Sequence, residues 1–336
     1  MVPELSIIII NYKTAQLVVN CLQSIYDQTQ NITFEILVVD NASGDDSRDT
    51  VCNSFPQVRW LQMDYNAGFA RANNEGIRQS MGETVLLLNS DTLNEDNAIE
   101  KCFRLFENSE YIACGVQLLN VDRTPQISGN FVVRGGLNHL LPLPYFGSLI
   151  KFLGSSFGAK KPNVPSAENL VEVDWINGAF LMVKKAAIDK AGLMDEDFFL
   201  YAEEAEWCSR LKKVGKLCIY GQFKILHLQG ASANKAFGSS GHGYYNLYDR
   251  KGFQIMLSNF VRVRKQFGVT WFLFHLVAFS ITVPLFLILS PFVSLFSGHN
   301  PMRDVRKAVG FAKNVGNLWR ITPIILSNKP HFYKAI

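Results

Sequence analysis

The feature that most constrains this chain's fold is a regular alternation of short apolar runs and amphipathic stretches over its first 120 residues. Leu5–Ile10 is a continuous β-branched run, which predicts a parallel strand buried on both faces. Thr14–Gln28 then places its apolar residues at helical spacing. The same two patterns predict strands at Phe34–Val39, Val58–Met63 and Thr84–Leu88 and a helix at Phe69–Ser80. This order predicts an α/β domain on a Rossmann-like, doubly wound, mostly parallel sheet.

Short polar residues follow three of the expected strands. A single Asp or Asn there means little, because both are ordinary turn and helix-cap residues. In open parallel sheets, however, ligands bind at the carboxyl ends of the strands, so three groups at one edge predict a binding site. The groups are Asp40 with Asn41, then Asp64, Asn66 and Gly68, and then Asn89, Ser90 and Asp91.

Two common phosphate-binding patterns are absent from the sequence. No GxxxxGK[ST] and no GxGxxG follows an expected strand, so neither a P-loop nor a dinucleotide-binding fold is supported. A phosphorylated ligand would have to be held in another way. A divalent cation bound to Asp91 is the simplest solution that the sequence offers.

The second part of the chain is less regular. Residues 121–170 are rich in Pro, Gly and Ser and predict a loop-rich insertion. A helix follows that carries Glu203, Glu204, Glu206 and Arg210, and short strands are expected near 216–220 and 224–227. By charge pattern alone the helix would be a solvated face with a Glu206–Arg210 pair. We expect one α/β domain over residues 1–240 and a basic, apolar helical region over 241–336.

The charge is unevenly distributed along the chain. Residues 250–336 hold twelve Lys or Arg and one acid, Asp304, whereas residues 1–249 hold 21 basic and 28 acidic residues. A basic tail on an acidic body predicts contact with an anionic surface. The tail's charges flank an apolar run and are not interleaved with aromatic residues, so a nucleic-acid binder is poorly supported.

That apolar run, Phe267–Gly298, has no charged residue and is long enough to cross a bilayer. It contains Pro284 and Pro291, and both of its flanks are basic, which disfavours a single span. We expect a re-entrant or interfacial helical hairpin, broken near the prolines, at the cytoplasmic face of the membrane. A single span and a soluble helix pair, which could form a homodimer, are the alternatives.

The cysteines and the N-terminus agree with a cytoplasmic location. The six cysteines form no CxxC and none has a zinc-like spacing to His, which predicts buried thiols in a reducing compartment. The N-terminus lacks the basic and apolar regions of a secretory signal.

Taken together in their order, these motifs resemble family-two glycosyltransferases over about residues 4–235. The nucleotide-sugar half is represented by Val38–Ser43, Asn66–Phe69 with Asn73, and Leu87–Asp91. The second half is represented by Trp175–Phe180, Gly192–Phe199, Tyr201–Arg210, and His227 with Gly230 and Ser232. The chain is most similar to bacterial rhamnosyltransferase-like members, which build cell-surface polysaccharide on lipid carriers. The resemblance implies an A-type glycosyltransferase fold.

The resemblance also implies roles for individual residues. Glu204 would be the catalytic base, and Asp40 would accept the N3–H of a uracil or thymine ring. Asp91, with His227, would bind Mg²⁺ or Mn²⁺. The nucleotide-sugar site would comprise Asp40, Asn41, Asn66, Gly68, Arg71, Asn73, Asn89 and Asp91, and the acceptor side Trp175, Gly178, Glu203 and Arg210.

Two residues depart from the family pattern. Asn89 stands where the metal motif has its first Asp, which weakens the expected metal site. Glu204 stands where the family has an Asp base, so its carboxylate is one methylene further from the helix, and Glu203 stays an alternative base.

The expected activity is therefore an inverting, metal-dependent transfer of a sugar from a nucleoside-diphosphate sugar of dTDP or UDP. By family likeness the donor would be dTDP-L-rhamnose and the acceptor a glycan or a lipid-linked glycan. The alternative is a non-catalytic nucleotide-sugar scaffold or sensor of the same fold.

Overall fold

A computed structural model describes residues 2–156, 162–228, 246–296 and 301–335, so Gly230 and Ser232 lie outside the described residues. The chain forms two compact units. The first comprises Met1–Phe131, Asn163–Phe199 and Glu203–Ser232, and the second Val132–Pro162, Leu200–Ala202 and Ala233–Ile336. The expected division into residues 1–240 and 241–336 stays a prediction.

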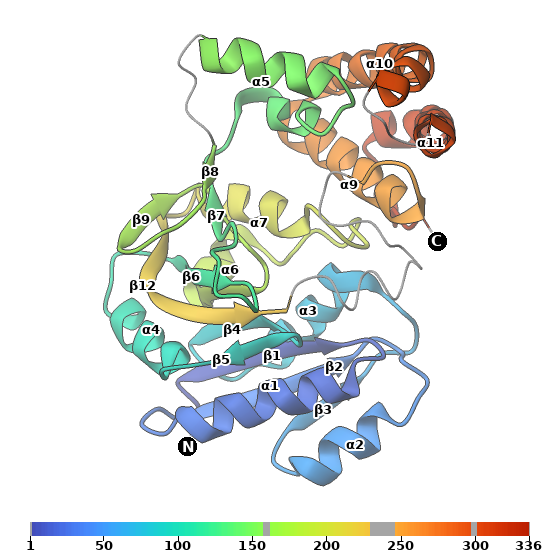
Figure 1. Ribbon diagram of the computed structural model, residues 1–336. Coiled ribbons are helices and arrows are strands. Elements are labelled where there is room, and N and C mark those ends of the chain that lie inside the picture. Colours follow the sequence, from blue (N-terminus) through green and yellow to red (C-terminus); the bar gives the residue numbers. More distant parts are fainter. Residues whose placement is uncertain (1, 157–161, 229–245, 297–300, 336) are drawn as a thin grey trace. The chain divides into compact units, whose positions relative to one another are not determined.

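The first unit is built on a large mixed sheet (Figure 1). Its strands, in spatial order, are β3 (Arg59–Gln62), β2 (Phe34–Asp40), β1 (Leu5–Asn11), β4 (Thr84–Asn89), β11 (Phe180–Lys184), β6 (Ala113–Leu119), β12 (Leu217–His227) and β5 (Thr92–Asn94), and β9 (Leu170–Val173) also pairs with β12. Strands β3, β2, β1 and β4 are parallel, which confirms the expected sheet. A second small sheet joins β10 (Trp175–Ile176), β7 (Gly129–Asn130) and β8 (Asn163–Val164).

Two features of the large sheet differ from the expectation. Strand β11 runs antiparallel between β4 and β6, a reversal that the pattern of the first 120 residues could not reveal. The two short strands expected near residues 216–220 and 224–227 form one strand, β12, whose pairing with β6 shifts register between Tyr220 and Lys224.

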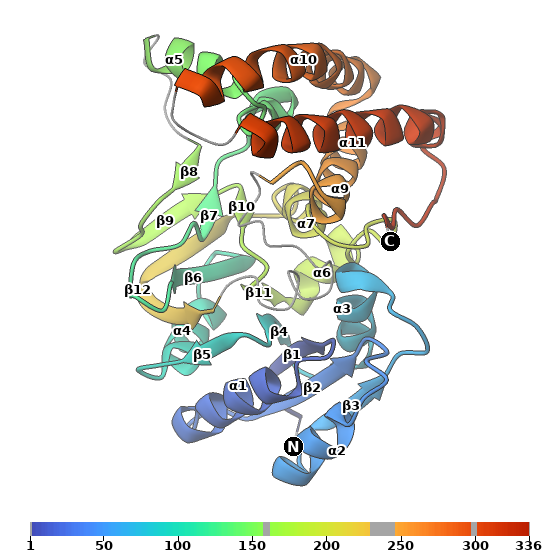
Figure 2. The ribbon, with the colours of Figure 1, turned by 45° about the vertical axis from the view of Figure 1, so that its right-hand side comes forward.

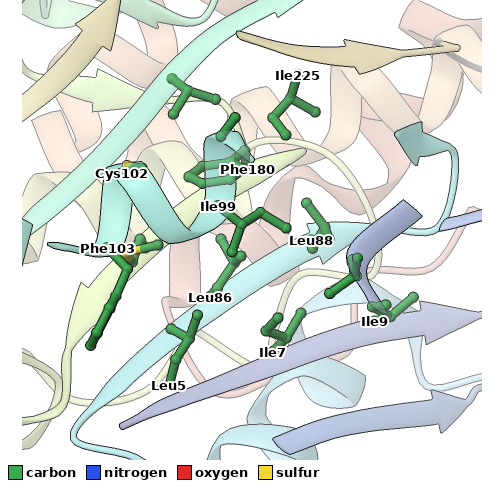
Figure 3. Close-up of a cluster of buried hydrophobic side chains, with 14 of the residues drawn as sticks. Leu5, Ile7, Ile9, Leu86, Leu88, Ile99, Cys102, Phe103, Phe180 and Ile225 are labelled. Carbon is green, nitrogen blue, oxygen red and sulfur yellow. The ribbon is translucent and has the colours of Figure 1, made fainter. Parts of the chain in front are cut away.

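Helices cover both faces of this sheet (Figure 2). They are α1 (Ala15–Gln28), α2 (Ser47–Ser54), α3 (Gly68–Gln79), α4 (Ala98–Glu107), α6 (Lys185–Ala191) and α7 (Glu203–Leu211). Because strand side chains alternate, Ile7 and Ile9 join the buried cluster with α1, α2 and α4, while Ile8 joins the cluster with α3, α6 and α7. Figure 3 shows the first cluster, in which residues of β1 and β4 face Ile99, Cys102 and Phe103 of α4.

The second unit is mostly helical. It contains the 3-10 segment η1 (Arg134–Leu140), α5 (Phe146–Ser156), α9 (Arg250–Phe267), α10 (Val269–Phe296) and α11 (Pro301–Ser327). Over Val269–Val293, α10 is long and apolar enough to cross a membrane, with a mean hydropathy of 2.4, and 39% of this stretch is buried.

The expected break near the prolines is wrong, because α10 runs through Pro284 and Pro291 without ending. A proline inside a helix costs about 3 kcal/mol, so other contacts must offset it. Phe279 and Phe286, on either side of Pro284, both pack on Phe311 of α11 with ring centroids 6.1 Å apart. This packing on both sides of the proline holds the helix together.

Candidate active site

Asp40 ends β2 at the carboxyl edge of the sheet and is only 3% exposed. Its Oδ1 accepts hydrogen bonds from Asn11 Nδ2 at 2.7 Å and from the Ser43 hydroxyl. Its Oδ2 accepts from the Ser43 backbone N–H at 2.9 Å and from Gln62 Nε2 at 2.8 Å. The Gln62 side chain belongs to an exposed residue, so it is the partner that a ligand could replace most easily. No sequence pattern pointed to Asn11 or Gln62, and Ser43 appeared only as the last residue of the Val38–Ser43 motif, with no role of its own.

Asn41 organises the loop that follows β3. Its Oδ1 accepts from the Ala67 N–H at 2.8 Å, and its Nδ2 donates to Asn66 Oδ1 at 3.1 Å and to the Gly68 carbonyl at 3.3 Å. Asn66 Oδ1 also accepts from the Gly68 N–H at 3.2 Å. These bonds join the ends of β2 and β3 into one polar surface, as the strand-end pattern predicted.

Gly68 begins α3 in the left-handed region, with φ +78°. A Cβ at this position would lie 2.2 Å from the Phe199 carbonyl oxygen, which accepts a hydrogen bond from the Phe69 N–H at 2.8 Å. Only glycine permits this close approach. Gly68 therefore brings the segment before α7 against the start of α3.

The next polar residues of α3 have partners within the first unit. Arg71 donates from Nε to the Glu196 carbonyl at 2.9 Å and from Nη1 to the Tyr65 hydroxyl at 2.8 Å. Asn73 donates to the Phe69 carbonyl at 2.9 Å, one helical turn back. In this conformation Arg71 and Asn73 support the loops around the strand ends.

Asn74, to which no sequence pattern pointed, binds the backbone of Met194 at two points. Its Nδ2 donates to the Met194 carbonyl at 2.9 Å, and its Oδ1 accepts from the Met194 N–H at 3.0 Å. The side chain is fully buried, so these bonds hold α3 against the segment that leads to α7.

Asp91 and His227 lie close together although they are far apart in the sequence. Asp91 Oδ1 lies 3.3 Å from His227 Nε2, and Asn89 Nδ2 lies 3.3 Å from the same nitrogen. The two side chains are 4% and 7% exposed. The two residues predicted to bind the metal, Asp91 and His227, and the predicted nucleotide-sugar residue Asn89 thus lie together.

The carboxylate of Asp91 is a suitable ligand for both Mg²⁺ and Mn²⁺. The imidazole nitrogen of His227 is a suitable ligand for Mn²⁺. Among the residues that the structure describes, no three His, Cys, Asp or Glu side chains form a metal cluster. Two protein ligands are nevertheless compatible with such ions, which often take their remaining ligands from water and substrate phosphate.

Cys21 lies beneath this group, with its Sγ 3.6 Å from the Thr92 hydroxyl and 3.9 Å from the Asn89 carbonyl. Burial raises the pKa of the Cys21 thiol to about 12, and the Asp91 charge also raises it. The thiol therefore stays protonated near neutral pH.

Strand register places the polar ends of β2 and β4 at the same edge of the sheet. Asn11 of β1 lies opposite Asp40, and the preceding Ile10 lies opposite Asn89. Asp40 and Asn89 therefore flank the end of β1, on strands to either side. The donor residues expected on β2 and β4 share one edge of the sheet.

Glu204, in the first turn of α7, is connected to this edge through Gly178. The N–H of Asn89 donates to the Ala179 carbonyl at 3.1 Å, directly after Gly178. A Cβ built on Gly178 would lie 3.6 Å from Glu204 Cβ and from Phe69 Cε1. Glu204 is 8% exposed. The start of α7, the β10–β11 turn and the start of α3 thus meet beside the end of β4.

The neighbouring charges of α7 have structural partners. Arg210 donates from Nε and Nη2 to the Glu206 carboxylate at 2.8 and 2.7 Å, and from Nη1 to the Ala191 carbonyl at 2.7 Å. The expected Glu206–Arg210 pair is therefore present, and Arg210 also ties α7 to the end of α6. Glu203 is 3% exposed, so the first turn of α7 is not a solvated face.

Trp175 of β10 lies opposite Asn130 of β7 in an antiparallel pair, so the two side chains share one face. Within the described part of the chain, Trp175 Nε1 and Asn130 Oδ1 are both buried without a hydrogen-bond partner. One is a donor and the other an acceptor. Asn130 was not identified from the sequence, because a lone Asn in a loop-rich stretch carries no distinguishing signal.

The mainly parallel sheet covered by helices is an A-type glycosyltransferase fold. Residues 6–141 match the model of the family described as glycosyl transferase family 2. This part of the chain is therefore similar to the family-two glycosyltransferases. The solved structure of GalNAc-T7 with UDP, GalNAc and Mn²⁺ resembles the chain with a TM-score of 0.50 and 12% identity, covering 67% of this chain and 43% of that one.

Two curated relatives extend the likeness beyond the matched domain. The low-salt glycan biosynthesis hexosyltransferase Agl10 of Haloferax volcanii is 28% identical over 218 residues, which are 63% of this chain and 63% of that protein. The N-acetylglucosaminyl-diphospho-decaprenol L-rhamnosyltransferase of Mycobacterium tuberculosis is 24% identical over 217 residues, 60% of this chain and 68% of that protein. The chain thus aligns with less than two thirds of the length of the first of these relatives.

Proposed function

We propose that this protein is an inverting glycosyltransferase that moves a sugar from a nucleoside-diphosphate sugar to a glycan or a lipid-linked glycan. One observation carries the proposal. Glu204 lies beside Gly178 and Phe69 next to the end of β4, and Asn89, at that same end, lies beside His227, which in turn lies beside Asp91. A donor site and a buried carboxylate at one sheet edge are what a direct displacement needs.

Asp40 would select the donor's base. A uracil or thymine ring presents an imide N–H, and the Asp40 carboxylate would accept it in place of the Gln62 amide. Asn11 and Ser43 would stay bound to the carboxylate and fix its orientation. Asn41, Asn66 and Gly68 would shape the neighbouring loop.

Asp91 and His227 would hold the divalent cation, which when bound stabilises the negative charge that develops on the leaving diphosphate. Asn89 Nδ2 lies 3.3 Å from His227 Nε2, so the cation would take the place of the Asn89 amide at this nitrogen. The Asp91 carboxylate suits both Mg²⁺ and Mn²⁺, the imidazole suits Mn²⁺, and sugar transfer would depend on the bound metal.

Glu204 would act as the general base. Its carboxylate takes the proton of an acceptor hydroxyl as that oxygen bonds to the anomeric carbon, while the bond from this carbon to the diphosphate oxygen breaks. A single displacement inverts the anomeric configuration and needs no second catalytic carboxylate. Trp175 and Asn130 would bind an acceptor hydroxyl, since a hydroxyl can accept from Nε1 and donate to Oδ1.

The names of two relatives support a particular donor sugar and a particular kind of acceptor. The mycobacterial relative is named an L-rhamnosyltransferase with a lipid-diphosphate acceptor, which supports dTDP-L-rhamnose as donor and a lipid-linked acceptor. The archaeal relative is named a hexosyltransferase of glycan biosynthesis, which supports a role in surface-polysaccharide synthesis.

Membrane association at the cytoplasmic face completes the proposal. The described part of α10 exposes a stripe of large apolar side chains, and lipid-linked acceptors lie at a membrane. Basic residues on α9 and α11 would favour an anionic surface.

The decisive experiment is a panel of nucleotide sugars incubated with the full chain, with Mn²⁺, with Mg²⁺ and with EDTA. We expect turnover or slow donor hydrolysis with one donor, abolished by EDTA and restored by metal. Tight donor binding without turnover for any acceptor would instead favour a non-catalytic nucleotide-sugar scaffold.

A further inference from the structure

Gln126 binds the backbone and the ring of His227 at the same time. Its Nε2 donates to the His227 carbonyl at 2.7 Å and to Asn120 Oδ1 at 2.8 Å, and its Oε1 lies 2.9 Å from His227 Nδ1. Gln126 and His227 are each 6% exposed, so water does not compete freely for these groups. The pair is a buried, directional contact between the end of β12 and the segment that follows β6.

The segment around Gln126 is itself held in place. The Gln126 backbone N–H donates to the Leu118 carbonyl at 2.8 Å, and the Gln126 carbonyl accepts from Gln117 Nε2 at 2.8 Å. The preceding turn is closed by a hydrogen bond of 2.8 Å from the Asn120 N–H to the Thr124 carbonyl. These hydrogen bonds hold Gln126 in place, so its side-chain amide can orient the imidazole ring of His227.

These contacts determine which ring nitrogen carries the proton. A backbone carbonyl can only accept, so the NH₂ group of Gln126 must be the group that faces the His227 carbonyl. The oxygen Oε1 then faces Nδ1, and since an amide oxygen can only accept, Nδ1 must be the donor. In a neutral ring this leaves the lone pair on Nε2, the nitrogen 3.3 Å from Asp91 Oδ1.

This lone pair faces the Asn89 amide, 3.3 Å away, and the Asp91 carboxylate, so a cation that displaces the amide would find two ligand atoms, Nε2 and Oδ1, close together. We propose that Gln126 is a positioning residue that keeps His227 in its Nδ1–H tautomer, so that Nε2 and Asp91 can share one divalent cation. The proposal rests on the proposed function, which assigns the cation to Asp91 and His227. In metal sites the second ring nitrogen of a ligating His commonly donates to such a partner, and losing the partner weakens binding about 10- to 100-fold.

Removal of the amide should change the tautomer. In Gln126→Leu nothing accepts from Nδ1 at this position, so the proton is better placed on Nε2, where it can be donated to Asp91. In that arrangement His227 Nε2 and Asp91 Oδ1 hydrogen-bond each other, so neither is available to bind the cation. Gln126→Glu keeps an oxygen in front of Nδ1 and should restore the original tautomer and most of the metal affinity.

The first test is the affinity for Mn²⁺ alone, measured on the full chain by electron paramagnetic resonance titration. We expect Gln126→Leu to bind Mn²⁺ about 10- to 100-fold more weakly than the unaltered chain, with Gln126→Glu between them. Asn74→Leu is the matched control, because Asn74 is a buried amide that also binds one residue, Met194, at two points. It should lower stability without changing Mn²⁺ affinity.

The second test needs neither metal nor substrate. Nitrogen-15 spectra of ring-labelled histidines, recorded at about pH 9 where an ordinary histidine is neutral, report the tautomer of His227 directly. We expect Nδ1–H in the unaltered chain and Nε2–H in Gln126→Leu. An Nε2–H ring in the unaltered chain overturns the proposal.

Unchanged Mn²⁺ affinity in Gln126→Leu, or no Mn²⁺ binding by the unaltered chain, also overturns the proposal. Absence of sugar transfer, with the expected tautomer and Mn²⁺ affinities intact, would remove the proposed function and leave the role of Gln126 in place.

Discussion

A Cβ on Gly68 would lie 2.2 Å from the carbonyl oxygen of Phe199, a residue much later in the chain. The first turn of α3 and the segment before α7 are thus packed at backbone contact. We expect Gly68→Ala to destabilise the first unit by about 2–4 kcal/mol, because the clash adds to the strain of a positive φ. The urea midpoint measures this loss.

Gly44→Ala is the matched control for this prediction. Gly44 also has a positive φ, +65°, but nothing lies within 4 Å of its Cβ position. It should lose only about 1 kcal/mol, the cost of the backbone conformation. Equal losses in the two variants would contradict the importance of the Phe199 contact.

Glu204→Gln should lower the rate of sugar transfer about 10²-fold or more, because an amide cannot take the acceptor's proton. Glu206→Gln should reduce stability through its pair with Arg210 and leave most of the activity. Initial rates at saturating donor, with folding checked by circular dichroism, separate the two effects. If Glu203→Gln loses the rate and Glu204→Gln does not, the base is Glu203.

Trp175→Phe keeps an aromatic ring but removes the indole N–H that has no partner within the described residues. If that N–H binds an acceptor hydroxyl, the acceptor KM should rise about tenfold, which is the value of one hydrogen bond, with kcat little changed. Trp319→Phe is the control, because its N–H donates to the Ser280 hydroxyl elsewhere. An unchanged acceptor KM in Trp175→Phe would remove Trp175 from the acceptor side.

Glu100 of α4 gives a pH dependence to stability. Burial acts to raise its pKa, but hydrogen bonds from Asn31, Asn97 and the backbone of Gln30 outweigh burial and lower the pKa to about 2. Because the folded pKa lies below the unfolded value, the stabilisation is complete above about pH 5 and is lost as pH falls toward 2.

We therefore expect Glu100→Gln to cost on the order of 2 kcal/mol at pH 7 and progressively less at lower pH. Urea midpoints at several pH values test this dependence. Glu107→Gln, which removes only a surface pair with Arg104, should change stability little at every pH. A constant difference between Glu100→Gln and the unaltered chain down to pH 3 would contradict the assignment.

Membrane association can be tested on the exposed face of α10. Ile281 and Ile288 are 54% and 61% exposed and lie two turns apart on the helix. Ile281→Asp together with Ile288→Asp should abolish flotation with anionic lipid vesicles, since a charge opposes insertion of an apolar face. Met81→Asp, on an exposed residue of the first unit, should float as the unaltered chain does. Unaltered flotation of the double variant would contradict lipid contact by α10.

Much of the first unit could be predicted because its signals are local. The apolar run of β1 and the helical spacing of α1 depend on neighbours a few residues away, and both elements formed where expected. The antiparallel insertion of β11 could not be predicted, because strand pairing depends on residues far along the chain. The helix α5 also lies in a stretch whose Pro and Gly content indicated loops.

The sequence by itself determined where the first four strands form, the polar residues at their ends and the apolar, basic character of the tail, because these follow from local periodicity and charge. Only the tertiary structure decided that Gly178 lies beside Glu204 and that the Gln126 amide hydrogen-bonds the ring of His227. Both contacts join segments that are distant in sequence, and hydrogen bonds and van der Waals contacts act only over a few ångströms.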